Sequence, residues 1–258
     1  MEASLKSADV TQVALMEECI IVVDENDNAI RPGSKKECHL VANMYAKSSG
    51  SGPADLLHRA FSVFLFDSKG RLLLQRRSAE KITFPLYWAN TCCSHPLHNE
   101  AEMELENALG VKRAAQRKLQ HELGITPDQV PLEDFTFLTR IHYRSKDPTH
   151  GDNTPWGEHE IDHVLVIQTK EGHDVVLKPD PNEVSETRYF SQEELGEFLA
   201  TAQEKGVRVS SWFYFIAKEL LPAWWRSLDN LEPVQDHATI HRAGEQDGIV
   251  STVPGDDR

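Results

Sequence analysis

Two neighbouring cysteines, Cys92 and Cys93, lie in the stretch WANTCCSHPLH (residues 88–98) of a chain with only four cysteines among 258 residues. A thiol is a nucleophile, a metal ligand or a proton carrier, and its ordinary pKa of about 8.5 is readily tuned toward neutrality. Adjacent cysteines are poorly placed to form a disulfide with each other. No second closely spaced Cys/His pair follows to complete a zinc knuckle. A buried structural pair, a metal site and a catalytic thiol all stay open.

A pair of carboxylates occurs in WGEHEID, residues 156–162. Alternate side chains of a strand share a face, so Glu158 and Glu160 are expected to point one way and His159 the other. Two carboxylates on one face repel each other unless a cation or a shared proton relieves them. A solvated acidic edge is the ordinary explanation, but this pair leads directly into the apolar run IDHVLVIQ. We therefore expect it at the mouth of the core.

Three histidines stand beside predicted core elements, in KECHL, LLHRAF and CCSHPL. Alone, each of His39, His58 and His95 is more simply a core or surface histidine. Together with Glu158 and Glu160 they would form a mixed nitrogen and oxygen site, which suits a divalent transition metal or Mg²⁺. Spacing along the sequence does not establish that the five residues converge.

A basic segment, QRRSAEK, follows a strand-like run in a chain that is otherwise acidic. It contains Arg76, Arg77 and Lys81. A solvated turn is one explanation. The functional alternative is a clamp for phosphate oxygens, which arginine binds in bidentate fashion.

The elements that must position these residues can be predicted from hydrophobic spacing and turn residues. The runs 58–66 and 71–77 are strand-like, and the DSKG between them suits a hairpin turn. Further strands are expected over 135–143, 160–168 and 186–191. One helix ends at Gly124, a second opens with the capping box of Ser191 and Glu194, and a third, over 210–228, breaks or kinks near Pro222.

Strands mixed with segregated helices indicate the α+β class, as an α/β/α sandwich in which helices flank a mixed sheet. We expect a single domain over residues 19–236. A flexible N-terminal extension, residues 1–18, is expected to precede it, and a disordered polar tail, residues 237–258, to follow it. No exposed apolar seam is evident, which favours a monomer.

The charge balance limits the choice of partners. The 41 acidic and 27 basic residues give a net charge of −14, which argues against nucleic acid or an anionic membrane surface. No apolar run approaches the ~20 residues of a membrane span. Four cysteines are too few for a secreted disulfide scaffold. The N-terminal segment resembles neither a secretory signal nor a transit peptide. We expect a cytoplasmic protein, with a plastid location open if a transit peptide has been removed.

Four blocks, LLHRAFSVFLF, KITFPLYWANTCCSHPL, LGVKRAAQRKLQHELGI and WGEHEID, resemble the signature blocks of type 1 isopentenyl diphosphate isomerase. The resemblance runs from His39 to Trp225, in order and with compatible spacing. That family has the Nudix fold, so the resemblance implies a mixed β-sheet flanked by helices.

The segment RKLQHELGI (117–125) is similar to the end of the Nudix box, REUxEExGU, where U is aliphatic. Glu122 and Gly124 match the pattern, but Lys118 and His121 replace two acids, and the upstream glutamate falls on Leu109. Nudix hydrolases use these acids to gather metals around a diphosphate under attack by water. The resemblance therefore implies a retained fold and an abandoned hydrolysis. A Nudix hydrolase of a small organic diphosphate is the alternative function, and a non-catalytic metal- or thiol-binding module is a third.

The resemblance implies interconversion of isopentenyl and dimethylallyl diphosphate through a tertiary carbocation, as a step of isoprenoid biosynthesis. Such a cation requires a dry pocket with an acid and a base on opposite faces of the hydrocarbon. Cys93 matches one of these groups, and Glu160, hydrogen-bonded to Tyr143, matches the other. We favour Glu160 with Tyr143 as the donor and Cys93 as the base. Trp212 matches the aromatic residue that faces the cation.

The same resemblance assigns the ligands. It implies that the diphosphate binds Arg77, Lys81 and Lys118 and carries a Mg²⁺ held by Glu122, and that Phe61 contacts the substrate. It also implies that Mg²⁺, Mn²⁺ or Zn²⁺ occupies a second site formed by His39, His58, His95, Glu158 and Glu160.

Overall fold

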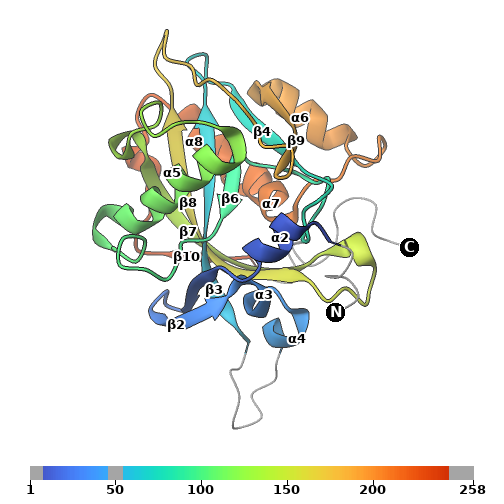
Figure 1. Ribbon diagram of the computed structural model, residues 1–258. Helices are drawn as coiled ribbons and strands as arrows, with labels where there is room; N and C mark the ends of the chain where they lie inside the picture. Colours follow the sequence, from blue (N-terminus) through green and yellow to red (C-terminus); the bar gives the residue numbers. More distant parts are fainter. Residues whose placement is uncertain (1–7, 46–54, 244–258) are drawn as a thin grey trace.

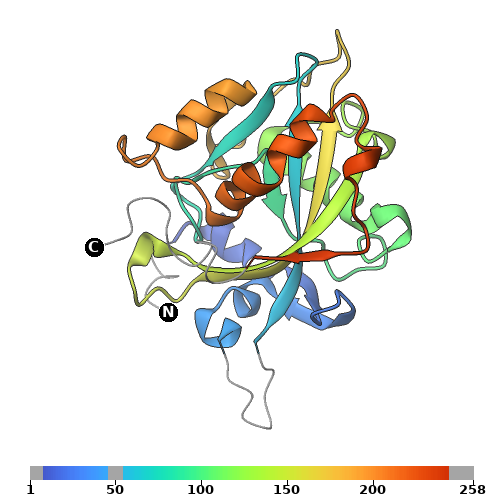
Figure 2. The ribbon, with the colours of Figure 1, turned by 180° about the vertical axis from the view of Figure 1, so that it is seen from behind.

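Residues 8–45 and 55–243 are described by the structure, a computed structural model, and they form a mixed sheet with helices on both faces (Figures 1 and 2). The longest path through the sheet follows the strand order β10-β7-β8-β3-β1-β2. These strands are β1 (Cys19–Val23), β2 (Ala29–Ser34), β3 (Leu57–Phe66), β7 (Thr136–Lys146), β8 (Gly157–Gln168) and β10 (Ile240–Arg242).

Strands β3 and β8 form the centre of the sheet and run parallel to each other. Every residue of β3, and every residue of β8 except the last, is buried. Strands covered on both faces are expected to be nearly continuous apolar runs. The polar residues that interrupt β8, among them Glu158 and Glu160, therefore mark a position where the interior must accommodate charge.

The second edge of β3 is shared by three strands. Its start pairs with β1, its middle with β6 (Cys92–Ser94), and its end, at Phe66, with the start of β4 (Leu72–Arg77). The hairpin expected over 58–77 therefore consists of a single residue pair. Beyond it, β4 leaves β3 and pairs with β9 (Val184–Phe190) and β5 (Trp88–Ala89).

Helices cover the sheet from both sides. In Figure 1, α5 (Leu109–Leu123) lies across the near face, and in Figure 2, α7 (Ser211–Glu219) and α8 (Leu221–Arg226) cross the opposite face. Alternation along β3 divides the core accordingly. Phe61 and Val63 pack with α5, whereas Phe64 and Phe66 pack with α7 and α8. The predicted α/β/α sandwich is confirmed.

Local sequence signals behave as expected. Gly124 ends α5 with a φ of +66°, a conformation that glycine adopts without strain. Ser191 and Glu194 form a reciprocal capping box at the start of α6 (Gln192–Thr201). The last apolar helix is interrupted at Leu220, and Pro222 occupies the first turn of α8.

The described ends of the chain are more structured than we expected. Asp9 caps α2 (Val10–Leu15), and Gln12 of this helix donates to Glu183 Oε1 at 2.9 Å. Residues 240–242 form β10 beside β7. Within the described residues, a helix therefore lies in the region of the expected extension and a strand in the region of the expected tail. Residues 1–7 and 244–258 lie outside the described part.

The remaining elements are short. They are the helices α3 (Lys35–Cys38) and α4 (Val41–Met44) and the 3₁₀ turns η1 (Glu106–Ala108), η2 (Leu132–Asp134), η3 (Pro148–His150) and η4 (Glu232–Val234). Within the described ranges, no helix combines the length and apolar character that a bilayer crossing requires.

Candidate active site and metal centre

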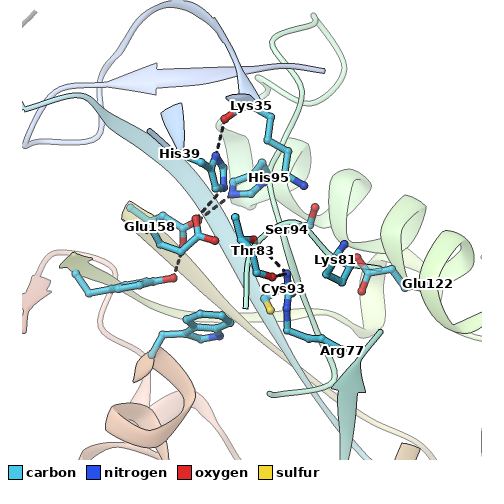
Figure 3. Close-up of a pocket in the computed structure, with 13 residues that line it drawn as sticks. Lys35, His39, Arg77, Lys81, Thr83, Cys93, Ser94, His95, Glu122 and Glu158 are labelled. Atoms are coloured by element: carbon cyan, nitrogen blue, oxygen red, sulfur yellow. Dashed lines mark hydrogen bonds and ion pairs between the residues drawn. The ribbon is translucent and has the colours of Figure 1, made fainter. Parts of the chain in front are cut away.

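A pocket of about 380 Å³, including the part open to solvent, is lined by side chains from the sheet and from both helical layers. Figure 3 shows His39, His95 and Glu158 gathered on one side of it, and Lys81 and Glu122 on another. Cys93, on β6, also lines this pocket. Residues far apart in sequence therefore meet at one place.

Three histidines and two glutamates converge at the first side of the pocket. They are His39, His58, His95, Glu158 and Glu160, all buried, and their potential ligand atoms lie within 4.8 Å of one another. The predicted alternation along β8 is also present, since His159 turns away and meets His142 instead, with 3.0 Å between the two Nε2 atoms.

The atoms of this cluster are arranged around a common centre. His39 Nε2 and Glu158 Oε2 lie 2.7 Å apart, yet neither has a hydrogen-bond partner. The Nε2 atoms of His58 and His95 lie 3.2 and 2.8 Å from Glu160 Oε1. Two buried carboxylates with oxygens within 4.8 Å of each other repel unless a cation offsets their charge. Nitrogen and carboxylate donors in this number fit a divalent ion.

The protonation of the histidines agrees with metal binding. Burial lowers the pKa of His58, and burial together with its histidine neighbours lowers the pKa of His95 well below its ordinary value. Neutral imidazole is the form that binds metals. His39 Nδ1 lies 2.6 Å from the Lys35 carbonyl oxygen. Donation from Nδ1 to that oxygen leaves Nε2 free for the cluster.

Glu160 is held at both of its oxygens. Besides the two histidines at Oε1, the Tyr143 hydroxyl donates to Oε2 at 2.5 Å. Burial alone would raise the pKa of Glu160, but hydrogen bonds from His58 and Tyr143 lower it. Burial raises the pKa of Tyr143 well above its ordinary value. In the Glu160–Tyr143 pair, the negative charge therefore lies on Glu160 and the proton stays on Tyr143.

Cys93 and Cys92 differ because successive residues of β6 face opposite sides. Cys93 lines the pocket, while Cys92 is fully buried in the core against α5. Burial raises the pKa of the Cys93 thiol to about 12. This favours the protonated thiol at neutral pH, because desolvation disfavours the thiolate.

Trp212, at the start of α7, closes the pocket from the opposite helical layer and is 4% exposed. Its ring stacks on Tyr143 with 6.1 Å between centroids and meets Phe84 edge to face at 5.1 Å. Its indole N–H donates to Asn90 Oδ1 at 3.1 Å. The pocket wall beside Tyr143 is therefore a fixed aromatic surface.

Cations gather at the remaining side. Arg77 donates to the carbonyl oxygens of Phe84 and Thr83, at 3.0 and 2.8 Å, which fixes its guanidinium. Phe84 adopts a φ of +47°, a strained conformation for a bulky residue. Lys81 lies 2.5 Å from Glu183 Oε2. This side of the pocket can bind an anion.

Glu122 of α5 lies among these cations. Lys118 Nζ is 3.3 Å from Glu122 Oε1, and Gln75 Nε2 donates to Oε2 at 3.0 Å. Burial opposes ionisation, but the charge of Lys118 lowers the pKa of Glu122. Lys118 itself is buried behind Glu122 and does not line the pocket. It is therefore a partner of this carboxylate in the structure.

The assignment of Phe61 to the substrate site was wrong. Phe61 is fully buried with Val63 and Leu65 in the core beneath α5. It lies three residues after His58 on β3, an odd spacing, so the two side chains face opposite sides of the sheet.

Two charged residues of the pocket region were missed. Lys35 lines the pocket, and burial, followed by the charges of Lys81 and Lys118, lowers its pKa to about 8. The available signal was its place four residues before His39, one helical turn away. Glu183, the buried partner of Lys81, gave no comparable signal, since it lies in the turn before β9 and that strand contributes no residue to the pocket.

Comparison with known proteins gives consistent matches over most of the chain. The NUDIX domain family matches residues 56–213. The Isopentenyl-diphosphate Delta-isomerase of Dictyostelium discoideum is 51% identical over 242 residues, which cover 93% of this chain and 95% of that protein. Isopentenyl-diphosphate Delta-isomerase 1 of Bos taurus is 46% identical, with coverage of 93% and 99%. Isopentenyl-diphosphate Delta-isomerase II, chloroplastic, of Arabidopsis thaliana is 48% identical, with coverage of 91% and 78%.

Proposed function

The chain belongs to the isopentenyl-diphosphate Delta-isomerase family, with the NUDIX domain as its fold, and we propose that its pocket isomerises isopentenyl diphosphate through Cys93 and Glu160. The predicted Nudix fold and the predicted isomerase class are confirmed by this membership. The observation that carries the proposed chemistry is the meeting of Cys93, the Glu160–Tyr143 pair and Trp212 in one buried pocket with a cationic side.

The reaction moves one proton onto the substrate and one away from it. Protonation of the terminal alkene carbon of isopentenyl diphosphate forms a tertiary carbocation, and loss of a proton from C2 gives dimethylallyl diphosphate. Cys93 on β6 and Glu160 on β8 lie on the two strands that flank β3. Side chains on two different strands can serve two faces of a hydrocarbon bound between them.

The resting protonation favours an order for these transfers. A thiol that carries its proton can donate before it accepts, and an ionised Glu160 can accept. This suits Cys93 as donor to the alkene and Glu160 as acceptor, the reverse of the order preferred from the sequence. In the opposite direction of the reaction the two roles exchange.

Trp212 supports the charged intermediate without reacting with it. An indole face is the best neutral stabiliser of a nearby cation, and the interaction strengthens where water is excluded. Trp212 and Tyr143 are both almost fully buried, so the hydrocarbon end of the substrate would lie among aromatic rings. Exclusion of water also protects the carbocation from capture as an alcohol.

The diphosphate end is proposed to bind Arg77, Lys81 and the newly identified Lys35, which line the pocket. Arginine contributes a planar fork and lysine a point charge. Glu122 would hold a Mg²⁺ that accompanies the diphosphate and neutralises part of its charge. Lys118 would then keep Glu122 ionised from behind.

The five-residue cluster is proposed as a resident metal site. A divalent ion held by His39, His58, His95, Glu158 and Glu160 would supply positive charge that offsets both carboxylates and sets the acidity of Glu160. The donor set suits Mn²⁺, Zn²⁺ or Mg²⁺.

Hydrolysis is disfavoured by the surroundings of Glu122. Lys118 and His121 stand where the Nudix pattern has acids, and they contact each other at 2.9 Å. The charge of Lys118 repels the further metal ions that a hydrolase must gather around the diphosphate, and His121, whose pKa is lowered by burial and by Lys118, supplies no carboxylate to hold them.

Product analysis tests this function. The protein, supplied with Mg²⁺ and isopentenyl diphosphate, is expected to yield dimethylallyl diphosphate and no inorganic phosphate. Glu160→Gln is expected to form neither product while unfolding like the wild-type protein. Release of phosphate by the wild-type protein without isomer would reject the isomerase in favour of the hydrolase.

Oligomeric state and location also stay proposals. We propose a monomer that acts on a small diphosphate in the cytoplasm, with the plastid as the alternative, as the name of the Arabidopsis relative suggests. Light scattering after gel filtration tests the first point, and imaging of the tagged protein tests the second.

A further inference from the structure

Trp212 carries a single polar side-chain atom, the indole nitrogen, on a ring that packs in the apolar core and also lines the pocket. The neighbouring Phe84 ring offers no acceptor, and the Tyr143 hydroxyl is bonded to Glu160. The indole N–H donates to Asn90 Oδ1 at 3.1 Å. A buried N–H without an acceptor is unfavourable, so the indole is drawn to the orientation in which this bond forms. The tilt of the aromatic wall therefore depends on Asn90.

Asn90 itself is fully buried and sits between β5 and β6, three residues before Cys93. Its Nδ2 donates to the carbonyl oxygens of Val63 and Cys92, at 3.2 and 3.0 Å. These partners can only accept, so the amide nitrogen must face them and the amide oxygen must face the indole. The hydrogen-bonding partners therefore fix the orientation of the Asn90 amide, since the flipped amide would lose all three hydrogen bonds.

We propose that Asn90 is a positioning residue, which holds the Trp212 indole at a fixed angle to the strand that carries Cys93. This inference rests on the proposed function. Attraction between a cation and an aromatic ring requires the cation to lie over the ring face. Without the hydrogen bond to Asn90, the indole can rotate about its side-chain bonds and present its edge, rather than its face, to the cation. Asn90 is not among the residues that line the pocket, so it acts through Trp212.

A double-mutant cycle isolates this role, because the indole N–H can be removed while an aromatic ring stays. Asn90→Ala is expected to lower kcat about tenfold to a hundredfold, with KM for isopentenyl diphosphate within about twofold of wild type. In the Trp212→Phe background, Asn90→Ala is expected to change kcat less than about twofold further, because phenylalanine has no N–H to hold. An equal fold-loss in both backgrounds would overturn the proposal.

Thr91 provides the matched control. It is also fully buried, beside Asn90, and its hydroxyl bonds the backbone at Leu65 and Leu73 without contacting Trp212. Thr91→Val should lower thermal stability and leave kcat within about twofold of wild type in both backgrounds. Should Asn90→Ala fail to fold, Asn90→Ser replaces it, since a serine hydroxyl can still donate to a carbonyl but is too short to reach the indole.

A spectroscopic readout is independent of turnover. The protein has five tryptophans, and the indole N–H signal of Trp212 in ¹⁵N-labelled protein is identified by its loss in Trp212→Phe. Asn90→Ala should shift this signal upfield, as expected for a lost hydrogen bond, whereas Thr91→Val should not. An unmoved signal would overturn the inference. The two proposals can fail separately. If the wild-type protein does not isomerise but the Trp212 signal still shifts in Asn90→Ala, the proposed function is rejected and the hydrogen bond between Asn90 and Trp212 is supported.

Discussion

At the scale of single residues, the site depends on which side of a strand each side chain faces. Cys93 and Cys92 are neighbours, yet one lines the pocket and the other lies in the core, where its Sγ is 3.5 Å from Glu122 Oε2. The same alternation separates Glu158 and Glu160 from His159. A shift of one residue in either strand would exchange the reactive and the inert groups.

Cys93→Ala is expected to lower kcat at least about a thousandfold, because the Ser94 hydroxyl, which also lines the pocket from β6, is a far weaker acid than a thiol and cannot replace it. Cys92→Ala is the matched control, and it should retain kcat within about tenfold while losing about 1 kcal/mol of stability from the small cavity. Steady-state kinetics and urea unfolding measure the two effects. Comparable kcat losses in the two variants would refute the assignment of the reactive thiol.

Metal content tests the cluster. Glu158→Gln removes one carboxylate donor, and the protein purified in the presence of Mn²⁺ or Zn²⁺ should then retain less than about a tenth of the wild-type metal after dialysis. His159→Gln, on the opposite face of the same strand, should retain the wild-type amount. Elemental analysis gives both values. Equal retention by wild-type protein and Glu158→Gln would show that Glu158 is not a ligand.

Strand periodicity made part of this site predictable. It correctly placed Glu158 and Glu160 on one face at the mouth of the core. It did not reveal Lys35, because the approach of α3 to the pocket depends on how β1 and β2 pack at the end of the sheet. The thiol pKa was also beyond prediction, since burial, which dominates it, is a tertiary property.

At the scale of elements, the start of β8 must approach β7 very closely. A Cβ on Gly157 would meet the Ser145 carbonyl oxygen at 2.6 Å and Lys146 Cα at 3.2 Å. Backbone atoms cannot move aside as the end of a flexible side chain can. Glycine at this position therefore lets Glu158, the next residue, reach the cluster.

Gly157→Ala should destabilise the fold by at least about 2 kcal/mol and also weaken metal retention, because it pushes β8 away from β7. In Gly196→Ala, on α6, the added methyl group meets nothing within 4 Å. That variant should gain up to about 1 kcal/mol from the better helix former. Urea unfolding of both variants provides the comparison. A Gly157→Ala protein as stable as wild type would show that the strands can separate without loss.

Asp27 ties the turn between β1 and β2 to the sheet. Its carboxylate lies 2.7 Å from Arg59 Nε and 2.7 Å from His163 Nε2. Burial opposes ionisation, but His163 and Arg59 lower the pKa of Asp27 from 3.8 to about 2. Since the folded pKa lies below the unfolded one, this stabilisation is present above the unfolded pKa and is lost as the pH falls through the folded pKa.

Asp27→Asn should therefore cost about 2 kcal/mol at neutral pH, because each tenfold change in the acid dissociation constant corresponds to about 1.4 kcal/mol. Asparagine tolerates the φ of +69° at this position, so the loss reports the charge. The difference from wild type should shrink to about half near pH 3. Urea unfolding at the two pH values measures it. A difference that grows on acidification would contradict the lowered pKa assigned to Asp27.

At the scale of the whole molecule, the division into two cores explains how the sheet can hold a charged pocket. One core lies under α5, the other under α7 and α8, and the cluster and Cys93 lie where β6 and β8 flank β3. The class, the end of α5 at Gly124 and the start of α6 after Ser191 followed from hydrophobic period and caps. The departure of β4 from β3 toward β9 did not, because strand pairing over more than 100 residues of sequence leaves no local signal.

The central claim is that protons pass between solvent and substrate through Cys93 and Glu160. Proton NMR of isopentenyl diphosphate, incubated in D₂O with the protein and Mg²⁺, tests it most directly. We expect deuterium to enter the methyl group as dimethylallyl diphosphate forms and to enter C2 of isopentenyl diphosphate as the reaction runs back, with neither label nor product for Cys93→Ala or Glu160→Gln. Dimethylallyl diphosphate formed without deuterium, or labelled normally by either variant, would contradict the account.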